Sequence, residues 1–408
     1  MTIVSKGIQS SVNTVFDGSS VIGVVGAGAM GAGIAQVAAM NGHRVILADA
    51  QPAAQQRAID GIKASLTRDV VKGRRVQADA DAIVARISLA GGVSEVELTA
   101  FAKCDLVIEA IVEELSVKRT LFRNLEAVLH DDAILASNTS SLSIAAIGGA
   151  CKRADHVVGL HFFNPAPIMP LVEIIPSIAT APDVAARVRA LATAWGKTTV
   201  MASDTPGFIV NRIARPFYGE AMRMLEEGIA DVATIDWAMR EVGGFRMGPF
   251  ELTDFIGQDV NFAVTRSVFD ATFNDPRYRP SIAQQRLVEA GLLGRKSGRG
   301  FYDYADDAVK PEATRDNVLG QTIVDRILAL LVNEAVDAVH LRIGSGADIE
   351  IAMTTGVNYP RGLLAWGDQI GAGSVLARLD ALHDEYGDDR YRASVRLRRI
   401  VRNGGTLA

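Results

Sequence analysis

A histidine and a glutamate, His161 and Glu173, stand twelve residues apart in two neighbouring apolar runs. Oxidation of an alcohol needs a base that takes the hydroxyl proton, and histidine suits this task because its unperturbed pKa is about 6.5. A carboxylate beside the ring would fix its tautomer. The pair therefore indicates general-base chemistry on a hydroxyl group. The spacing alone is equally compatible with a structural histidine, since the chain has six histidines and most need no catalytic explanation.

A glycine-rich segment near the N-terminus is typical of a dinucleotide-binding turn. It comprises Gly26, Gly28, Met30 and Gly31, follows an apolar run and precedes helix-forming residues. Glycines permit a tight turn and let backbone amides approach a pyrophosphate at the start of the helix. Asp49, 18 residues after Gly31, would bind a ribose 2′-hydroxyl and repel a 2′-phosphate. The segment therefore predicts NAD rather than NADP; the alternative is a glycine-rich turn that binds nothing.

These residues fall within a pattern of apolar runs and helical segments that predicts a parallel sheet. The first two runs and the helix between them form a β-α-β unit, for which a right-handed crossover is the rule. We expect a doubly wound, Rossmann-type domain over residues 19–202, from which a charged helical hairpin at 52–89 projects. The predicted strands are residues 21–25, 44–48, 106–110, 133–137, 157–160 and 171–175.

The rest of the chain is predicted to be helical and duplicated. Residues 211–257 align with 325–371 without a gap. This repeat indicates an all-α C-terminal domain in two copies, 203–304 and 321–408, joined by a linker at 305–320. Residues 1–18 are interpreted as a polar leader. The matching pairs include Arg212 and Arg326, Glu220 and Glu334, Ile235 and Ile349, Gly248 and Gly362, Asp254 and Asp368, and Gly257 and Gly371.

Composition excludes several classes of partner. The formal net charge is -5, so no cationic field favours nucleic acid. No apolar stretch approaches the roughly 20 residues of a membrane span, and the residues suggest no metal site. With only two cysteines in 408 residues, we expect a reducing, cytoplasmic location.

Longer motifs, taken in order, resemble the 3-hydroxyacyl-CoA dehydrogenases. The resemblance runs from about Val21 to Tyr304, and the second repeat extends it nearly to the C-terminus. The repeat, with NYPRGLLAWG near its end, is most similar to bacterial 3-hydroxybutyryl-CoA and 3-hydroxyadipyl-CoA dehydrogenases of the phenylacetate-degradation type. The motifs are GAGAMGAGIA, DLVIEAIVEELSVKRTLF, SNTSSLSI, GLHFFNPAPIMPLVEII, DTPGFIVNR, GPFELTDFIG and GRKSGRGFYDY.

The resemblance implies NAD-dependent oxidation of a (3S)-3-hydroxyacyl-CoA to the 3-oxoacyl-CoA, with 3-hydroxybutyryl-CoA or 3-hydroxyadipyl-CoA as substrate. Two alternatives stay open: a related dehydrogenase of a free hydroxy acid, and a non-catalytic structural protein on the same fold. Two-domain members of the family use the helical domain for dimer contacts. We therefore expect a homodimer in which the second copy serves as an internal partner and builds no second active site.

The same resemblance assigns roles to individual residues. His161 would be the general base and Glu173 would orient it. Ser140 and Asn211 would bind the reacting end of the substrate, Ser140 and Asn164 would contact the cofactor, and Glu113, Lys118 and Lys296 match further NAD-contacting positions. Ser65 and Lys72 on the hairpin would contact coenzyme A. A substrate with a distal carboxylate would also need an arginine in the acyl pocket to bind that carboxylate. The sequence leaves three candidates for this role, Arg215, Arg246 and Arg361.

Overall fold

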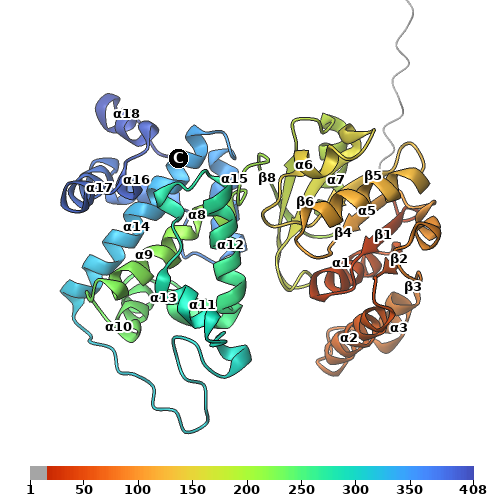
Figure 1. Ribbon diagram of the computed structural model, residues 1–408, viewed down its shortest axis with the longest axis horizontal. Coiled ribbons are helices and arrows are strands. Elements are labelled where there is room, and N and C mark those ends of the chain that lie inside the picture. Colours follow the sequence, from red (N-terminus) through yellow and green to blue (C-terminus); the bar gives the residue numbers. More distant parts are fainter. Residues whose placement is uncertain (1–15) are drawn as a thin grey trace, which may run out of the picture.

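The computed structural model describes residues 16–408, so most of the polar leader predicted at 1–18 lies outside the described residues. The chain forms an α/β lobe, at the right of Figure 1, and a helical lobe at the left. Within residues 16–408, none of the helices has the length and apolar character needed to span a membrane.

The α/β lobe is built on one eight-stranded sheet with the order β3-β2-β1-β4-β5-β6-β7-β8. The strands from β3 to β6 are parallel, β7 is antiparallel to β6, and β8 is parallel to β7. The order reverses at β1 and β4, the position at which ligands bind in doubly wound sheets. The strands are β1 (Val21–Val25), β2 (Arg44–Ala48), β3 (Ile87–Leu89), β4 (Leu106–Glu109), β5 (Ile134–Ser137), β6 (Val157–Phe162), β7 (Leu171–Pro176) and β8 (Thr198–Met201).

Two strands depart from the sequence-based prediction. The sequence places residues 87–89 in the helical hairpin, but they form the edge strand β3, and β8 was not predicted. Both strands are short and lie at the two edges of the sheet. Only the first residue of β3 and the third of β8 are buried, so neither strand carries the continuous apolar run that marks the central strands.

The hairpin consists of α2 (Pro52–Val71) and α3 (Gln77–Ala85), which project below the sheet in Figure 1. Pro52 opens α2, where its missing N–H costs nothing. Ala58, Ile62 and Leu66 recur every four residues and bury one face of the helix. Gly73 ends the hairpin's first arm with a φ of 67°, which glycine adopts without strain. The opposite face stays free for a ligand.

The remaining helices of the α/β lobe flank the sheet, and the helical lobe contains the two copies of the repeat. The flanking helices are α1 (Ala29–Met40), α4 (Glu95–Leu98), α5 (Leu115–Val128), α6 (Ile144–Gly148) and α7 (Pro182–Ala194). The first copy comprises α8 (Val210–Ile213), α9 (Arg215–Glu226), α10 (Val232–Trp237), α11 (Pro249–Ile256), α12 (Gln258–Ala271) and α13 (Ile282–Glu289). The second comprises α14 (Asn317–His340), α15 (Gly346–Gly356), α16 (Leu363–Ile370), α17 (Ala372–Tyr386) and α18 (Val395–Asn403).

The element order repeats with the predicted offset, which confirms the duplication. The helices α11 and α16 begin 114 residues apart, and so do α12 and α17. One difference has a clear cause. The single helix α14 corresponds to the broken pair α8 and α9, because Pro216 stands where α14 has Leu330. Proline lacks the N–H that would continue the helix and clashes with the preceding turn.

The two copies exchange buried ion pairs across their interface. Arg212 Nε lies 3.0 Å from Glu334 Oε1, and Arg326 Nε lies 2.6 Å from Glu220 Oε1. Each arginine is the repeat counterpart of the other, and so is each glutamate. Such mutual pairing is the pattern of an isologous, two-fold interface. The second copy therefore packs on the first in the way that one subunit packs on another.

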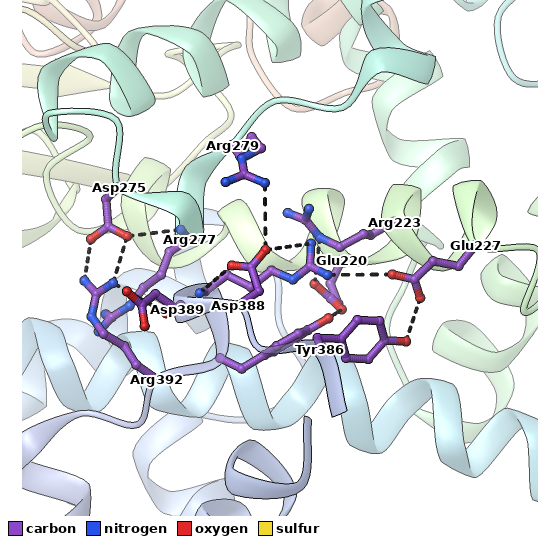
Figure 2. Close-up of polar contacts among 12 residues, drawn as sticks. Glu220, Arg223, Glu227, Asp275, Arg277, Arg279, Tyr386, Asp388, Asp389 and Arg392 are labelled. Atoms are coloured by element: carbon purple, nitrogen blue, oxygen red, sulfur yellow. Dashed lines mark hydrogen bonds and ion pairs between the residues drawn. The ribbon is translucent and has the colours of Figure 1, made fainter. Parts of the chain in front are cut away.

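A second exchanged pair lies at the edge of this interface and is visible in Figure 2. Asp275 Oδ2 lies 2.5 Å from Arg392 Nη2, and Asp388 Oδ2 lies 3.8 Å from Arg279 Nη1. Figure 2 also shows Glu227 of the first copy accepting a hydrogen bond from the Tyr386 hydroxyl of the second. The symmetry thus extends beyond the buried centre.

We expect Glu334→Gln to destabilise the protein by about 3–5 kcal/mol, because it leaves the buried Arg212 without its counter-charge. Glu334 accepts from Arg212, Arg277 and Tyr278. The matched control is Asp380→Asn, which breaks the half-exposed pair with Arg398 and should cost about 0–1 kcal/mol. Urea denaturation measures both. Equal, small losses would show that the exchanged pairs do not hold the copies together.

Candidate active site

The predicted base and its partner face each other across two antiparallel strands. His161 on β6 and Glu173 on β7 are directly opposite in the sheet register. His161 Nδ1 lies 2.6 Å from Glu173 Oε2, and both side chains are buried. A carboxylate oxygen only accepts, so Nδ1 carries the ring proton in this bond and Nε2 is left with the lone pair. Nε2 is therefore the atom that can take a proton.

The second oxygen of Glu173 is held by the start of the helical lobe. The backbone N–H groups of Ile209 and Val210 both donate to Glu173 Oε1 at 3.0 Å. The chain turns sharply before them, because Gly207 and Phe208 both have positive φ, 76° and 48°. A bulky residue in this region stores strain of about 1–3 kcal/mol. The turn donates both hydrogen bonds to the buried Glu173 carboxylate, and these bonds hold the turn in place.

The residues predicted to bind the reacting end of the substrate come from different lobes and meet beside this pair. Ser140 follows β5, and Asn211 lies on α8. Asn211 Nδ2 lies 3.5 Å from the backbone oxygen of Ser140. Asn164 follows β6, is exposed, and precedes a cis peptide bond to Pro165. The structure therefore brings Ser140 and Asn211 together and leaves the Asn164 side chain open to solvent.

Glu113 organises the segment after β5. Its Oε1 accepts from the Thr139 hydroxyl at 2.6 Å and from the Ser140 backbone N–H at 3.0 Å. Burial raises the pKa of Glu113, but the charge of Lys118 and these hydrogen bonds outweigh burial and hold the pKa below its ordinary value. Glu113 is an ionised group that fixes the Ser140 backbone.

Lys118 is a buried cation that lies between two carboxylates. Only 1% of its side chain is exposed, and its Nζ lies 2.6 Å from Glu109 Oε1 and 3.2 Å from Glu113 Oε2. Two carboxylates therefore compensate this buried cation. A lysine so enclosed positions Glu113, and its contact with NAD stays a prediction.

The glycine-rich turn has the shape that a pyrophosphate requires. Gly26 has a φ of 106°, and a Cβ there would lie 2.3 Å from the Ala110 carbonyl oxygen. A Cβ on Gly31 would lie 1.7 Å from the Gly26 oxygen, so only glycine lets α1 approach β1 this closely. A Cβ on Gly28 would meet no atom within 4 Å, and Met30, two residues on, is half-buried. The glycine-rich turn is packed against the strands on one side and open on the other. The open side lies at the N-terminus of α1, where no side chain caps the backbone N–H groups.

Asp49 lies just after β2 beside this turn. Its Oδ2 accepts from the Ala27 N–H at 2.7 Å, and its Oδ1 accepts from the Gln51 N–H at 2.8 Å. These bonds fix the carboxylate next to the glycine-rich turn while leaving acceptor capacity on both oxygens. The arrangement fits a ribose hydroxyl and is unfavourable for a phosphate.

The other predicted binding residues lie further out. Lys296 belongs to the helical lobe, where its Nζ lies 2.5 Å from Asp259 Oδ1, and its contact with NAD stays a prediction. On the hairpin, Ser65 is half-buried and Lys72 is exposed immediately after α2. Arg74 nearby pairs with Asp69 at 3.7 Å. Lys72 has no such carboxylate partner among residues 16–408.

Sequence reasoning missed several residues that support the site. Glu109, at the end of β4, accepts from the Lys118 ammonium and from the Ser137 hydroxyl, both at 2.6 Å, and so links β4, β5 and Lys118. The Asn138 side chain accepts from the Phe162 N–H at 2.8 Å and fixes the strand end beside His161. The position of Asn138, just after β5, was the available signal.

A groove of about 860 Å³ lies elsewhere, between the edge of the sheet and the second copy. It is bounded by Pro176, Met201 and Asp204 on one side and by Arg342 and Ser345 on the other, and the lining contains none of the predicted site residues. The groove is therefore separate from the buried His161–Glu173 pair.

Comparison with known proteins decides the family. Residues 21–205 match the model of the 3-hydroxyacyl-CoA dehydrogenase NAD-binding domain, and residues 207–304 and 323–406 match that of the C-terminal domain. The chain belongs to the 3-hydroxyacyl-CoA dehydrogenase family. This confirms the resemblance inferred from the sequence, the NAD cofactor and the oxidoreductase class. The two C-terminal matches also agree with the repeat seen in the helices.

The family's members include relatives with this whole architecture. A 3-hydroxyadipyl-CoA dehydrogenase of Escherichia coli K12 is 40% identical over 94% of this chain and 98% of that protein. The crystal structure of a 3-hydroxybutyryl-CoA dehydrogenase from the same species superposes with a TM-score of 0.87, at 38% identity, over 93% of this chain and 98% of that one. The human mitochondrial hydroxyacyl-coenzyme A dehydrogenase is 41% identical over 69% of this chain and 90% of its own length.

We expect the enzyme to use NAD at least about tenfold more efficiently than NADP, because the fixed Asp49 carboxylate repels a 2′-phosphate. Asp49→Asn should narrow this preference. The control is Asp60→Asn, an exposed change on α2 that should leave it intact. Steady-state rates with both cofactors give the ratio. Use of NADP as readily as NAD by the unaltered enzyme would refute the role of Asp49.

Proposed function

We propose that this enzyme oxidises the 3-hydroxyl group of (3S)-3-hydroxyacyl-CoA thioesters to the 3-ketone, with His161 as the base. The observation that carries the proposal is the His161–Glu173 pair, buried where the two lobes meet, with Nε2 unpartnered among residues 16–408. The relatives named 3-hydroxybutyryl-CoA and 3-hydroxyadipyl-CoA dehydrogenases support the substrate class. Two cysteines in the whole chain fit a cytoplasmic setting.

Side chains of the enzyme take the proton and hold the substrate in this reaction. NAD, when bound, supplies the hydride acceptor. His161 Nε2 takes the hydroxyl proton, and the imidazolium that forms is stabilised by Glu173 at 2.6 Å. Phe163 and Phe208 pack against the imidazole, with ring centroids 4.6 and 5.8 Å away, and restrict access of water to it. Ser140 and Asn211 hold the reacting end of the thioester.

The hairpin favours a thioester of coenzyme A over a free hydroxy acid. Ser65 and Lys72 are seven residues apart, which places them on one side of α2. Arg68 and Arg75 lie on the same hairpin. A cationic cluster of this kind suits the phosphates of coenzyme A and would have no purpose toward a small free acid. The non-catalytic alternative is disfavoured by the paired histidine and the open glycine-rich turn.

We expect His161→Ala to lower kcat by about 10²–10⁴-fold, the usual contribution of general-base catalysis, while NAD affinity stays nearly unchanged. His156→Ala is the matched control, because His156 immediately precedes the same strand and its ring forms a hydrogen bond with the Ala133 carbonyl instead of with a carboxylate. Turnover of 3-hydroxybutyryl-CoA is followed by NADH absorbance. Near-normal turnover of His161→Ala would return this residue to a structural role.

We expect Lys72→Ala to raise KM for acyl-CoA by about 10–100-fold, since a charged hydrogen bond to phosphate contributes about 1.5–3 kcal/mol. An N-acetylcysteamine thioester, which lacks those phosphates, should lose much less. Lys63→Ala is the control, because nine residues of α2 turn Lys63 to the opposite side of the helix. Equal losses for both thioesters would remove the hairpin from the coenzyme A site.

A further inference from the structure

Arg215 is a buried arginine one turn beyond the proposed substrate residue Asn211. It begins α9 after the break caused by Pro216, and only 5% of it is exposed. Its Nε donates to the Asn211 backbone oxygen at 2.7 Å, and its Nη1 donates to Thr265 Oγ1 at 2.9 Å. The guanidinium therefore lies between the turn that carries Asn211 and the helix α12.

This guanidinium has no counter-charge. Among residues 16–408, no carboxylate oxygen lies within 4.0 Å of it, whereas its neighbour Arg212 is paired with Glu334. Burial lowers the pKa of Arg215, and only Tyr218 and Tyr359 act against this. Arginine nevertheless stays charged near neutral pH. A buried, unpaired cation is costly, so a protein retains one where an anionic ligand will pair with it.

Aromatic side chains and one hydroxyl group without a hydrogen-bond partner among the described residues surround Arg215. The guanidinium carbon lies 5.0 Å from the centroid of the Tyr218 ring. Tyr359, from the second helical copy, is 5% exposed, and its hydroxyl is buried without a hydrogen-bond partner among residues 16–408. Phe217 and Phe245 pack on the Tyr359 ring, with centroids 5.7 and 5.1 Å away. An unsatisfied buried hydroxyl in a native protein calls for an explanation.

We propose that Arg215, assisted by the Tyr359 hydroxyl, binds a carboxylate at the far end of the acyl chain and makes ω-carboxyacyl-CoA thioesters the preferred substrates. This inference rests on the proposed function and specifies its substrate class. The guanidinium donates to the Asn211 backbone oxygen, so the proposed carboxylate site lies one helical turn from the residue that would hold the reacting end. 3-Hydroxyadipyl-CoA has this chemistry, with a thioester at one end and a carboxylate at the other.

Arg215 differs in burial from the two other arginines that the sequence left open as partners for a distal carboxylate. Arg246 and Arg361 are both exposed. Arg361 also donates to the Gln369 side chain and lies 5.5 Å above the Trp366 ring. Neither is a desolvated cation, which is the state in which a single charge pair contributes most to specificity. The alternative to carboxylate binding is that Arg215 has only a structural role and connects α8 to α12 through its hydrogen bonds.

A matched pair of substrates distinguishes these possibilities. 3-Hydroxyadipyl-CoA and 3-hydroxyhexanoyl-CoA have the same chain length and differ only in a terminal carboxylate or methyl group. We expect the unaltered enzyme to prefer the adipyl substrate. Arg215→Met should reduce the ratio of the two kcat/KM values by about 100-fold, mostly through KM for the adipyl substrate, because one partner of a buried charge pair is lost. Arg246→Met is the control and should leave the ratio unchanged.

Tyr359→Phe provides a second test should Arg215→Met fail to fold. It removes a hydroxyl that bonds to no described residue, so the melting temperature should hold while the preference for the adipyl substrate falls. Three results would overturn the inference. The first is that both variants keep the kcat/KM ratio of the unaltered enzyme, and the second is that they lose kcat/KM equally for both substrates. The third is that the unaltered enzyme shows no preference for the adipyl substrate. Failure of the unaltered enzyme to oxidise either thioester would instead overturn the proposed function.

Discussion

The buried carboxylate of Glu173 is the interaction on which the site depends. Burial of a charge is costly unless every acceptor site is used, and here His161 takes one oxygen while the backbone of Ile209 and Val210 takes the other. One side chain of the sheet therefore orients the base and anchors the first turn of the helical lobe. Asn211 follows immediately, so the same contact sets the distance between the base and the substrate residues.

The duplicated helical domain supports this arrangement through a two-fold exchange of charges. The pairs Arg212–Glu334 and Arg326–Glu220 are buried, and each needs both copies. Because Arg212 lies next to Asn211, the second copy steadies the turn that carries the substrate residue. Tyr359, also from the second copy, reaches the surroundings of Arg215. The second copy thus stabilises the site of the first and, in our proposal, completes it.

The central strands, the glycine-rich turn and the repeat could be predicted from sequence, because each leaves a periodic or positional signal. The edge strands β3 and β8 could not, since so few of their residues are buried. The burial of Lys118 between two carboxylates could not be predicted, because sequence spacing does not reveal which charges enclose a side chain. For Arg215 the decisive property is a missing partner, and only the folded chain shows which charges stay unpaired.

The central claim is that Glu173 holds His161 in the tautomer that leaves Nε2 free to accept a proton. Nitrogen-15 NMR of histidine-labelled enzyme measures this directly, with the His161 signals assigned by their loss in His161→Gln. The account predicts that the neutral ring carries its proton on Nδ1 and that Nε2 has the shift of an unprotonated nitrogen. A neutral ring protonated on Nε2 would contradict it.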